Sequence, residues 1–574
     1  MKCKFLYITL LISITLSAQI KKKDTLNTEV INVVKPFNPT VSDAFKIRRN
    51  PNLMLDSVAK PKNFKYHIVS VPVASTFIPA RGNYVRLKAK QNIIYDNFIS
   101  GGFGSYKTPI VEFFIHNEPN NDSDLGAYFN LLSSNGGVKN VLVNDAFSDI
   151  NFEAYYKQSQ NQFDWQINSG VHLQKYNWYG ISPFITPNPN LFSNISFKQN
   201  YNNFYAKGAI SYFDSFFQGA NFTYNFISDN YKSNESHVFL SPEFSFPLVS
   251  EFLTTQISLD YLEGKFDRDY LNVNPISYQF LNLGLHPNLE VKQQNLSFNL
   301  GVKLYYSTAS KNQSINKFYA YPNITASYKI NENGFSAFAG ITGDLHQNTY
   351  NDFVNENNFV SPTLLIKPTD KQYDVYLGIK GLENGISYNF KASYKNENNK
   401  ALFMLNPAKD INITNKAYEF GNSFNVVYDN VKTFTLEAKT SITFIKNLEF
   451  GGNFAFHNYS LSVQNEAWNL PKIKADLFAK YNYKKWFVKT HLFIVGRRKG
   501  QLSHLFTSSI ISSPQIINNA AYFDLNINGG YYFSDRLLAF AKFNNILGDN
   551  YRQFTNYRVQ GFQALAGITY KFDF

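Results

Sequence analysis

The sequence predicts an all-β protein: a transmembrane antiparallel β-barrel of about 22 strands (range about 20 to 24), preceded by an irregular N-terminal segment. Three observations predict this fold. Apolar and polar residues alternate in successive segments from about residue 95 to the end, aromatic residues make up 17% of the chain, and the last strand ends on aromatic side chains. No stretch after residue 20 approaches the roughly 18 consecutive apolar residues that a membrane helix requires.

Residues 1–18 have the pattern of a secretory signal peptide. Lys2 and Lys4 precede an apolar core over 5–16, and Ala18 ends a plausible cleavage region. The only cysteine, Cys3, lies before that core. The mature chain therefore has no cysteine, and we expect neither a disulfide nor thiolate chemistry.

Residues 19–92 form an extended, proline-rich segment. Its prolines stand without sustained alternation, which favours irregular structure. Within it, 28–34 is a short stretch with β-forming residues (Thr-Glu-Val-Ile-Asn-Val-Val) that could pair with the edge of a partner's sheet. A simple tether is the alternative interpretation of this segment.

Residues 93–574 are predicted to form the barrel. In 561–574, one face of the strand is apolar and the other is largely polar, since successive side chains point to opposite faces. The apolar face carries Phe562, Ala564, Ala566, Ile568, Tyr570, Phe572 and Phe574. The same alternation recurs over 295–306, 433–444, 472–481 and 523–533. A lipid-facing surface on one side and an aqueous lumen on the other explain this pattern.

The connections between the predicted strands are of two kinds, as in outer-membrane barrels. Short ones are predicted at 159–162, 331–334, 382–385, 445–447 and 534–536. Long ones are predicted near 177–192, 264–276, 350–371, 397–416, 458–470, 497–517 and 546–558. Between about 213 and 250 the pattern does not show which connections lie on the side of the short turns and which on the side of the long loops. A soluble β-sandwich or propeller is disfavoured by the signal peptide and by the aromatic ends of the apolar faces.

No catalytic or metal-binding signature appears, so the sequence predicts neither an enzyme nor a cofactor. The nine histidines are scattered singly, without an H-x-x-x-H or H-E-x-x-H pair, and no G-x-S-x-G turn occurs. The formal charge of +13 reflects a moderate excess of lysine and arginine. We interpret this excess as a solvated lumen and loops, with attraction to anionic lipid heads or anionic solutes as the alternative, and we expect no nucleic-acid partner.

Two stretches near the end resemble a known family. Residues 538–551 (LAFAKFNNILGDNY) and 564–572 (ALAGITYKF) resemble the last strands of TonB-dependent receptors. Residues 428–431, 435–437 and 446–450 also resemble the later strands of that family, and the earlier barrel resembles it only in style. The Asn- and Lys-rich composition and the Ser-Ala-Gln cleavage region resemble proteins of Bacteroidota.

The resemblance implies a 22-stranded barrel in the outer membrane of a Gram-negative bacterium, solute import and energy from TonB. It implies that a Ton box lies near the mature N-terminus, on Thr28, Glu29, Val30, Ile31 and Val33. It also implies a plug domain of well over a hundred residues, whereas only about sixty residues separate Val34 from Tyr95 in this chain. We therefore expect residues 35–92 to fold inward as a small plug; the loops 350–371 and 397–416, or a partner protein, are the alternatives.

The sequence thus predicts an outer-membrane transport barrel that imports an unidentified solute. A non-transporting barrel subunit of an outer-membrane or surface complex, and a passive porin, are the other two hypotheses. The expected partners are outer-membrane lipid, the barrel-assembly machinery, TonB, and a surface lipoprotein or periplasmic protein. Tyr570, Phe572 and Phe574 are the predicted barrel-assembly signal.

Overall fold

The computed structural model describes residues 95–120, 122–186, 192–248, 251–271, 274–311, 315–331, 334–410, 415–505 and 514–573. The predicted signal peptide, the Ton-box stretch and the segment 19–92 lie outside the described residues. The barrel predicted over 93–574 can therefore be compared with the structure, whereas the N-terminal predictions cannot.

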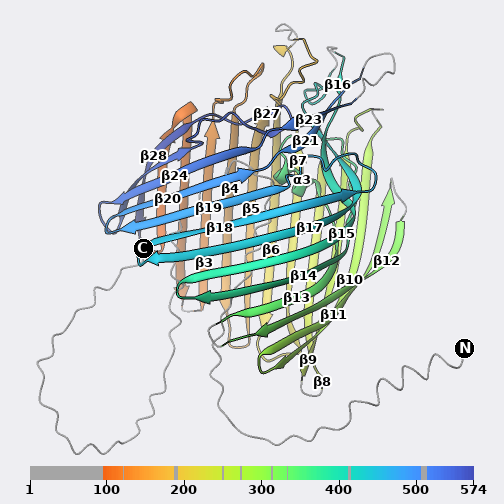
Figure 1. Cartoon of the computed structure of the whole chain (residues 1–574), viewed down its shortest axis with the longest axis vertical. Helices are drawn as coiled ribbons and strands as arrows, with labels where there is room; N and C mark the ends of the chain where they lie inside the picture. The colour runs from red at the N-terminus through yellow and green to blue at the C-terminus, as the bar shows by residue number, and fades with distance from the viewer. Residues whose placement is uncertain are drawn as a thin grey trace, which may run out of the picture. The chain divides into compact units, whose positions relative to one another are not determined.

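Twenty-two strands form one antiparallel sheet, in which each strand pairs with the next along the chain and β28 pairs with β1 (Figure 1). The sheet is thus a closed barrel, and the predicted strand number is confirmed. The strands are β1 Asn97–Gly104, β2 Thr108–Asn120, β3 Ser123–Ser134, β4 Phe147–Ser159, β5 Phe163–Asn177, β6 Lys198–Tyr212, β7 Phe217–Asp229, β8 Asn234–Leu248, β9 Glu251–Phe266, β10 Ile276–Gln293, β11 Leu296–Lys311, β12 Ile315–Lys329, β13 Ser336–His346, β14 Thr369–Glu383, β15 Ile386–Leu405, β17 Phe424–Ile445, β18 Leu448–Leu461, β19 Ile473–Tyr483, β20 Trp486–Val495, β24 Tyr522–Tyr532, β25 Leu537–Asn544 and β28 Gln563–Phe572.

The remaining elements are short and lie in the connections. They are the 3-10 turn η1 Ser105–Lys107, the helix α3 Tyr350–Glu356, and the strands β16 Ala408–Lys409, β21 Arg498–Leu502, β22 His504–Leu505, β23 Gln515–Asn519, β26 Arg552–Phe554 and β27 Tyr557–Arg558. Among the described residues, no helix has the length and apolar character to cross a membrane.

The last strand has the two faces that the sequence predicts. Ile568 and Tyr570 are 56% and 43% exposed on the outer face, whereas Leu565 and Thr569 are each 4% exposed on the inner face. Outward-facing Leu300, Leu436 and Leu477 are likewise exposed. A wall with apolar side chains exposed on its outer surface suits contact with lipid, because those side chains have no protein partner to pack against.

Short turns connect the strands at one end of the barrel, here called the turn end, and longer connections lie at the other, the loop end. The connection between β7 and β8 lies at the loop end but spans only 230–233. Because this loop is as short as a turn, loop length could not distinguish the two ends of the barrel between 213 and 250. The long connection predicted at 397–416 instead spans 406–423. Strand β15 continues to Leu405 because its backbone keeps pairing with β17 beyond a register shift at Glu397 and Lys400.

Aromatic rings lie against glycines of neighbouring strands on the inner wall. A Cβ on Gly567 would lie 2.4 Å from Phe540 Cζ, and one on Gly530 would lie 2.5 Å from Phe487 Cε1. Phe540 and Phe487 are buried although they belong to the lumenal face. Glycine leaves the backbone uncovered, and a ring from the adjacent strand fills that space and shields the hydrogen bonds beneath it.

Candidate functional site

Five of the connections at the loop end pack together around an apolar core, and we call these five connections the lid. The lid comprises the described parts of 178–197, 267–275, 347–368, 406–423 and 545–562. Most of its buried apolar side chains belong to the same cluster as inward-facing residues at the loop ends of the strands, whereas Tyr551 and Val559 form a second cluster with Val495 and Tyr522. The first cluster includes Trp178, Tyr201, Phe280, Tyr350, Phe353, Phe359, Val360, Leu364, Phe403, Tyr418, Phe420, Phe424, Phe554 and Tyr557.

Phe359 connects two opposite sides of the barrel. Its ring lies 6.5 Å, centroid to centroid, from that of Tyr176 in β5. Its carbonyl oxygen accepts a 2.8 Å hydrogen bond from the backbone N–H of Phe424, the first residue of β17. Strands β5 and β17 are the fifth and sixteenth of the 22 strands in order around the barrel. The apolar core of the lid therefore spans the mouth from one wall to the other.

The helix α3 is fixed to the wall by a buried carboxylate. Its first turn has free N–H groups, which attract a negatively charged acceptor. Glu235, at the loop end of β8, accepts hydrogen bonds from the backbone N–H groups of Tyr350 (2.7 Å) and Asn351 (3.2 Å). The Thr349 hydroxyl accepts from Asp352 N at 3.0 Å and forms the N-cap. The hydroxyl of Tyr350 donates to Asp229 of β7.

The segment 417–424 is central to the lid. The Asn422 amide donates to the carbonyl oxygens of Trp178 and Ala417, each at 2.9 Å, and the Tyr557 hydroxyl donates to the Asn422 carbonyl. Gly421 has φ +64°, and a Cβ there would lie 2.7 Å from Ser182 Cβ, so both the conformation and the space require glycine. Three connections thus meet at this one turn.

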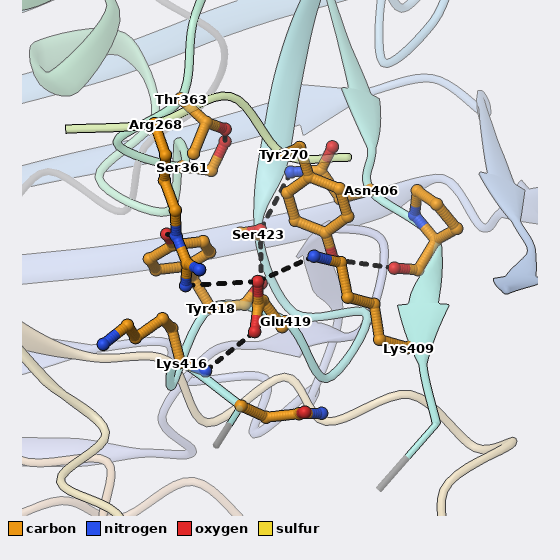
Figure 2. Close-up of polar contacts among 12 residues, drawn as sticks. Arg268, Tyr270, Ser361, Thr363, Asn406, Lys409, Lys416, Tyr418, Glu419 and Ser423 are labelled. Carbon is orange, nitrogen blue, oxygen red and sulfur yellow. Dashed lines mark hydrogen bonds and ion pairs between the residues drawn. The ribbon is translucent and has the colours of Figure 1, made fainter. Parts of the chain in front are cut away.

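A polar cluster surrounds the Glu419 carboxylate at the edge of the apolar core (Figure 2). Its Oε1 accepts a 2.7 Å hydrogen bond from Lys409 Nζ and lies 3.4 Å from Arg268 Nη2. Its Oε2 accepts from the backbone N–H of Lys416 at 2.8 Å. Glu419 is 4% exposed, so the two cations compensate a carboxylate that has lost most of its contact with water.

Two tyrosines complete this group, and we call Arg268, Tyr270, Lys409, Tyr418 and Glu419 the Glu419 cluster. Arg268 Nε donates to the Tyr418 hydroxyl at 3.0 Å, and Tyr270 donates to the Pro407 carbonyl at 2.7 Å. Lys409 Nζ lies 4.7 Å from the centre of the Tyr270 ring. Burial raises the pKa of Tyr418 to about 12, above the ordinary value for tyrosine. The cluster joins the 267–275 connection to the 406–423 connection.

The predicted site residues lie elsewhere. Tyr570 and Phe572 stack in β28 with ring centroids 6.2 Å apart, and Phe574 lies outside the described residues. Thr28, Glu29, Val30, Ile31 and Val33 also lie outside them. The sequence did not indicate the Glu419 cluster, because its members come from two connections about 140 to 150 positions apart and form no motif.

Several of the described histidines pair with carboxylates, whereas Nδ1 of His457 lies 2.9 Å from the Thr435 hydroxyl oxygen. His172 Nε2 lies 2.9 Å from Asp149, and His237 Nε2 lies 2.8 Å from Asp260. Within the described ranges, no three or more His, Cys, Asp or Glu side chains gather closely enough to hold a metal ion.

Comparison with known proteins identifies relatives of the fold only. No protein-family model and no curated protein matches the sequence. Among solved structures, the FrpB iron transporter from Neisseria meningitidis aligns with a TM-score of 0.64 and 9% identity, over 84% of this chain and 82% of its own. P. aeruginosa FpvA, bound to a heterologous pyoverdine and iron, aligns with a TM-score of 0.61 and 12% identity, over 83% and 72%.

A third solved structure, the copper transporter OprC, aligns with a TM-score of 0.60 and 11% identity, over 83% of this chain and 80% of its own. At these identities the likeness establishes the fold. The chain has a 22-stranded barrel, and its fold is like those of these three solved structures.

Proposed function

We propose that this protein is an outer-membrane import barrel that takes up a solute through its loop end, with energy supplied by TonB. The observation that carries the proposal is the lid across the mouth of a 22-stranded barrel. A barrel of this size encloses a wide lumen. A lid over it fits a receptor that admits one bound solute, and the solved structures with this fold include an iron transporter and a copper transporter.

The lid also distinguishes this proposal from a passive porin. A porin keeps an aqueous channel open, whereas Phe359 and its neighbours form an apolar core between opposite walls. In this proposal, water and ions do not cross that core until it rearranges. In this proposal the rearrangement follows solute binding at the lid and a pull by TonB on the N-terminal stretch, of which Val30 and Ile31 are the apolar centre.

The experiment is binding of the purified periplasmic domain of TonB to the full-length protein in detergent. We expect measurable binding, and a loss of at least tenfold in affinity for Ile31→Pro, because proline removes a backbone donor needed for strand pairing. Val69→Pro, in the same N-terminal segment but outside the stretch, is the matched control. Equal binding by the wild type and both variants would contradict the proposal.

Two other outcomes would support the competing hypotheses. A stable stoichiometric partner in native detergent extracts, without TonB binding, would favour a barrel subunit of a surface assembly. Rapid swelling of liposomes in sugar solutions would favour a porin. A genuine import receptor gives neither result.

A further inference from the structure

The Glu419 cluster has the composition of an anion-binding site. A guanidinium group, an ammonium group and a backbone N–H all point toward one carboxylate (Figure 2). These are the donors with which proteins bind carboxylate and phosphate ligands. Here the bound anion is a side chain of the chain itself.

The guanidinium group of Arg268 is incompletely bonded. Its Nη2 is buried, makes no hydrogen bond within the described part of the chain, and lies at ion-pair distance, 3.4 Å, from Glu419. A guanidinium group can form two parallel hydrogen bonds with a carboxylate, and Glu419 does not reach that geometry. A free carboxylate is not constrained by a backbone and can align with both cations.

We propose that Arg268 and Lys409 form a solute-binding site for a multivalent carboxylate, and that Glu419 is an internal ligand which the solute displaces. The binding step stands on this geometry alone. Its role as the signal that loosens the lid rests on the import function proposed above.

Displacement would alter a defined part of the lid. The Glu419 carboxylate holds the Lys416 N–H, and it links the 406–423 connection to Arg268 of the 267–275 connection. Three other bonds do not involve this carboxylate: Arg268 Nε to the Tyr418 hydroxyl, Tyr270 to the Pro407 carbonyl, and Lys409 N to the Glu419 carbonyl oxygen at 3.0 Å. We therefore expect 415–424 to loosen while the two connections stay attached.

The charges around the site predict selectivity by direct pairing. Asp267 and Asp269 flank Arg268 in sequence, so the surroundings are not uniformly basic. A solute must pair with the guanidinium and ammonium groups themselves, and a compact ligand with two or more carboxylates does so best. General attraction of anions, which falls steeply with salt, contributes little here.

The test is hydrogen exchange of the full-length protein in detergent, with and without citrate, at constant ionic strength. For the wild type we expect citrate to speed exchange at 415–424 at least threefold, while inorganic phosphate has a smaller effect and sucrose none. For Arg268→Gln we expect no response to citrate. For Glu419→Gln we expect faster exchange without citrate, and citrate binding at least threefold tighter by calorimetry, because the internal competitor has lost its charge.

Lys499→Gln is the control, since Lys499 pairs with Glu466 at 3.7 Å in other connections at the same end. It should respond to citrate as the wild type does. Retained heat-modifiable migration on gels would show that each variant is folded. Citrate binding of equal strength in the wild type, Arg268→Gln and Glu419→Gln would overturn the proposed site. Citrate binding that follows these expectations, together with no TonB binding, would overturn the import function and leave the site standing.

Discussion

Phe359 and Tyr557 stack face to face, with ring centroids 3.6 Å apart and ring planes inclined by 15°. The two residues belong to the 347–368 and 545–562 connections, which are nearly 200 positions apart. Tyr557 also donates its hydroxyl hydrogen to the Asn422 carbonyl, so the stack joins the central turn of the lid to the residue that spans the mouth. The connections of the lid therefore depend on one another for their packing.

Removal of this stack should open the barrel without unfolding it. We expect Phe359→Ala to cost the lid about 3–5 kcal/mol of packing, the usual cost of deleting a buried phenyl ring. In planar bilayers the variant should conduct ions in frequent, large steps, whereas the wild type stays mostly closed. Leu377→Ala is the control, because Leu377 is 65% exposed on the outer wall. If Phe359→Ala conducts no more than the control, the lid is not the barrier.

Glu235 should fix the position of α3. Glu235→Ala leaves the N–H groups of Tyr350 and Asn351 without acceptors, at about 1–3 kcal/mol each. We expect the amides of 350–356 to exchange with solvent about 10- to 100-fold faster, because the free energy of local opening of the helix becomes smaller. Glu243→Ala, farther along the same strand, is the matched control. Unchanged exchange at α3 would mean that its apolar contacts alone hold it.

The pairing of β28 with β1, which closes the barrel, should be weakened by one added methyl group. A Cβ on Gly567 would lie 2.4 Å from both the Gly101 carbonyl oxygen and Phe540 Cζ, so Gly567→Ala forces backbone or ring to shift. We expect a loss of about 1–3 kcal/mol in the free energy of unfolding, measured by urea titration in lipid vesicles. Gly208→Ala is the control, because the nearest atom to its Cβ lies at 3.9 Å. Equal stability of the two variants would show that the pairing of β28 with β1 relaxes freely.

The barrel could be predicted from the sequence because each strand carries its own evidence. Outward Leu300 and Leu436 alternate with polar neighbours, and lipid and lumen impose that alternation on every strand. The predicted end of β15 was wrong by several residues, because 397–400 reads Glu-Asn-Asn-Lys, as a loop does, whereas the strand pairs with β17 again from Lys400 to Leu405 after a register shift. Backbone hydrogen bonds can extend a strand without any alternation of apolar and polar side chains.

The loops 350–371 and 397–416 were one of the alternatives for filling the lumen, but the contacts of the lid could not be predicted because they join distant parts of the chain. The amide of Asn422 reaches the carbonyl of Trp178 across 244 positions, and Arg268 reaches Tyr418 across 150. Such pairs leave no periodicity and no spacing in the sequence. Only the closure of the barrel, which brings the ends of all the strands into one ring, places these connections together.

The aromatic residues at the end of the chain should affect assembly more than stability. Tyr570 and Phe572 stack on β28, and Phe572 follows the last residues that pair with β25. A signal read by the assembly machinery acts before the barrel closes, so its loss slows insertion while the finished barrel keeps nearly all its contacts.

We expect Phe572→Ala combined with Phe574→Ala to lower the heat-modifiable, folded fraction in cells at least fivefold. The same variant, refolded from urea into detergent, should unfold within about 1 kcal/mol of the wild type. Ile568→Ala, on the same outer face, should assemble normally in cells. Equal losses in cells and in the refolded protein would show that these residues stabilise the barrel and do not guide its assembly.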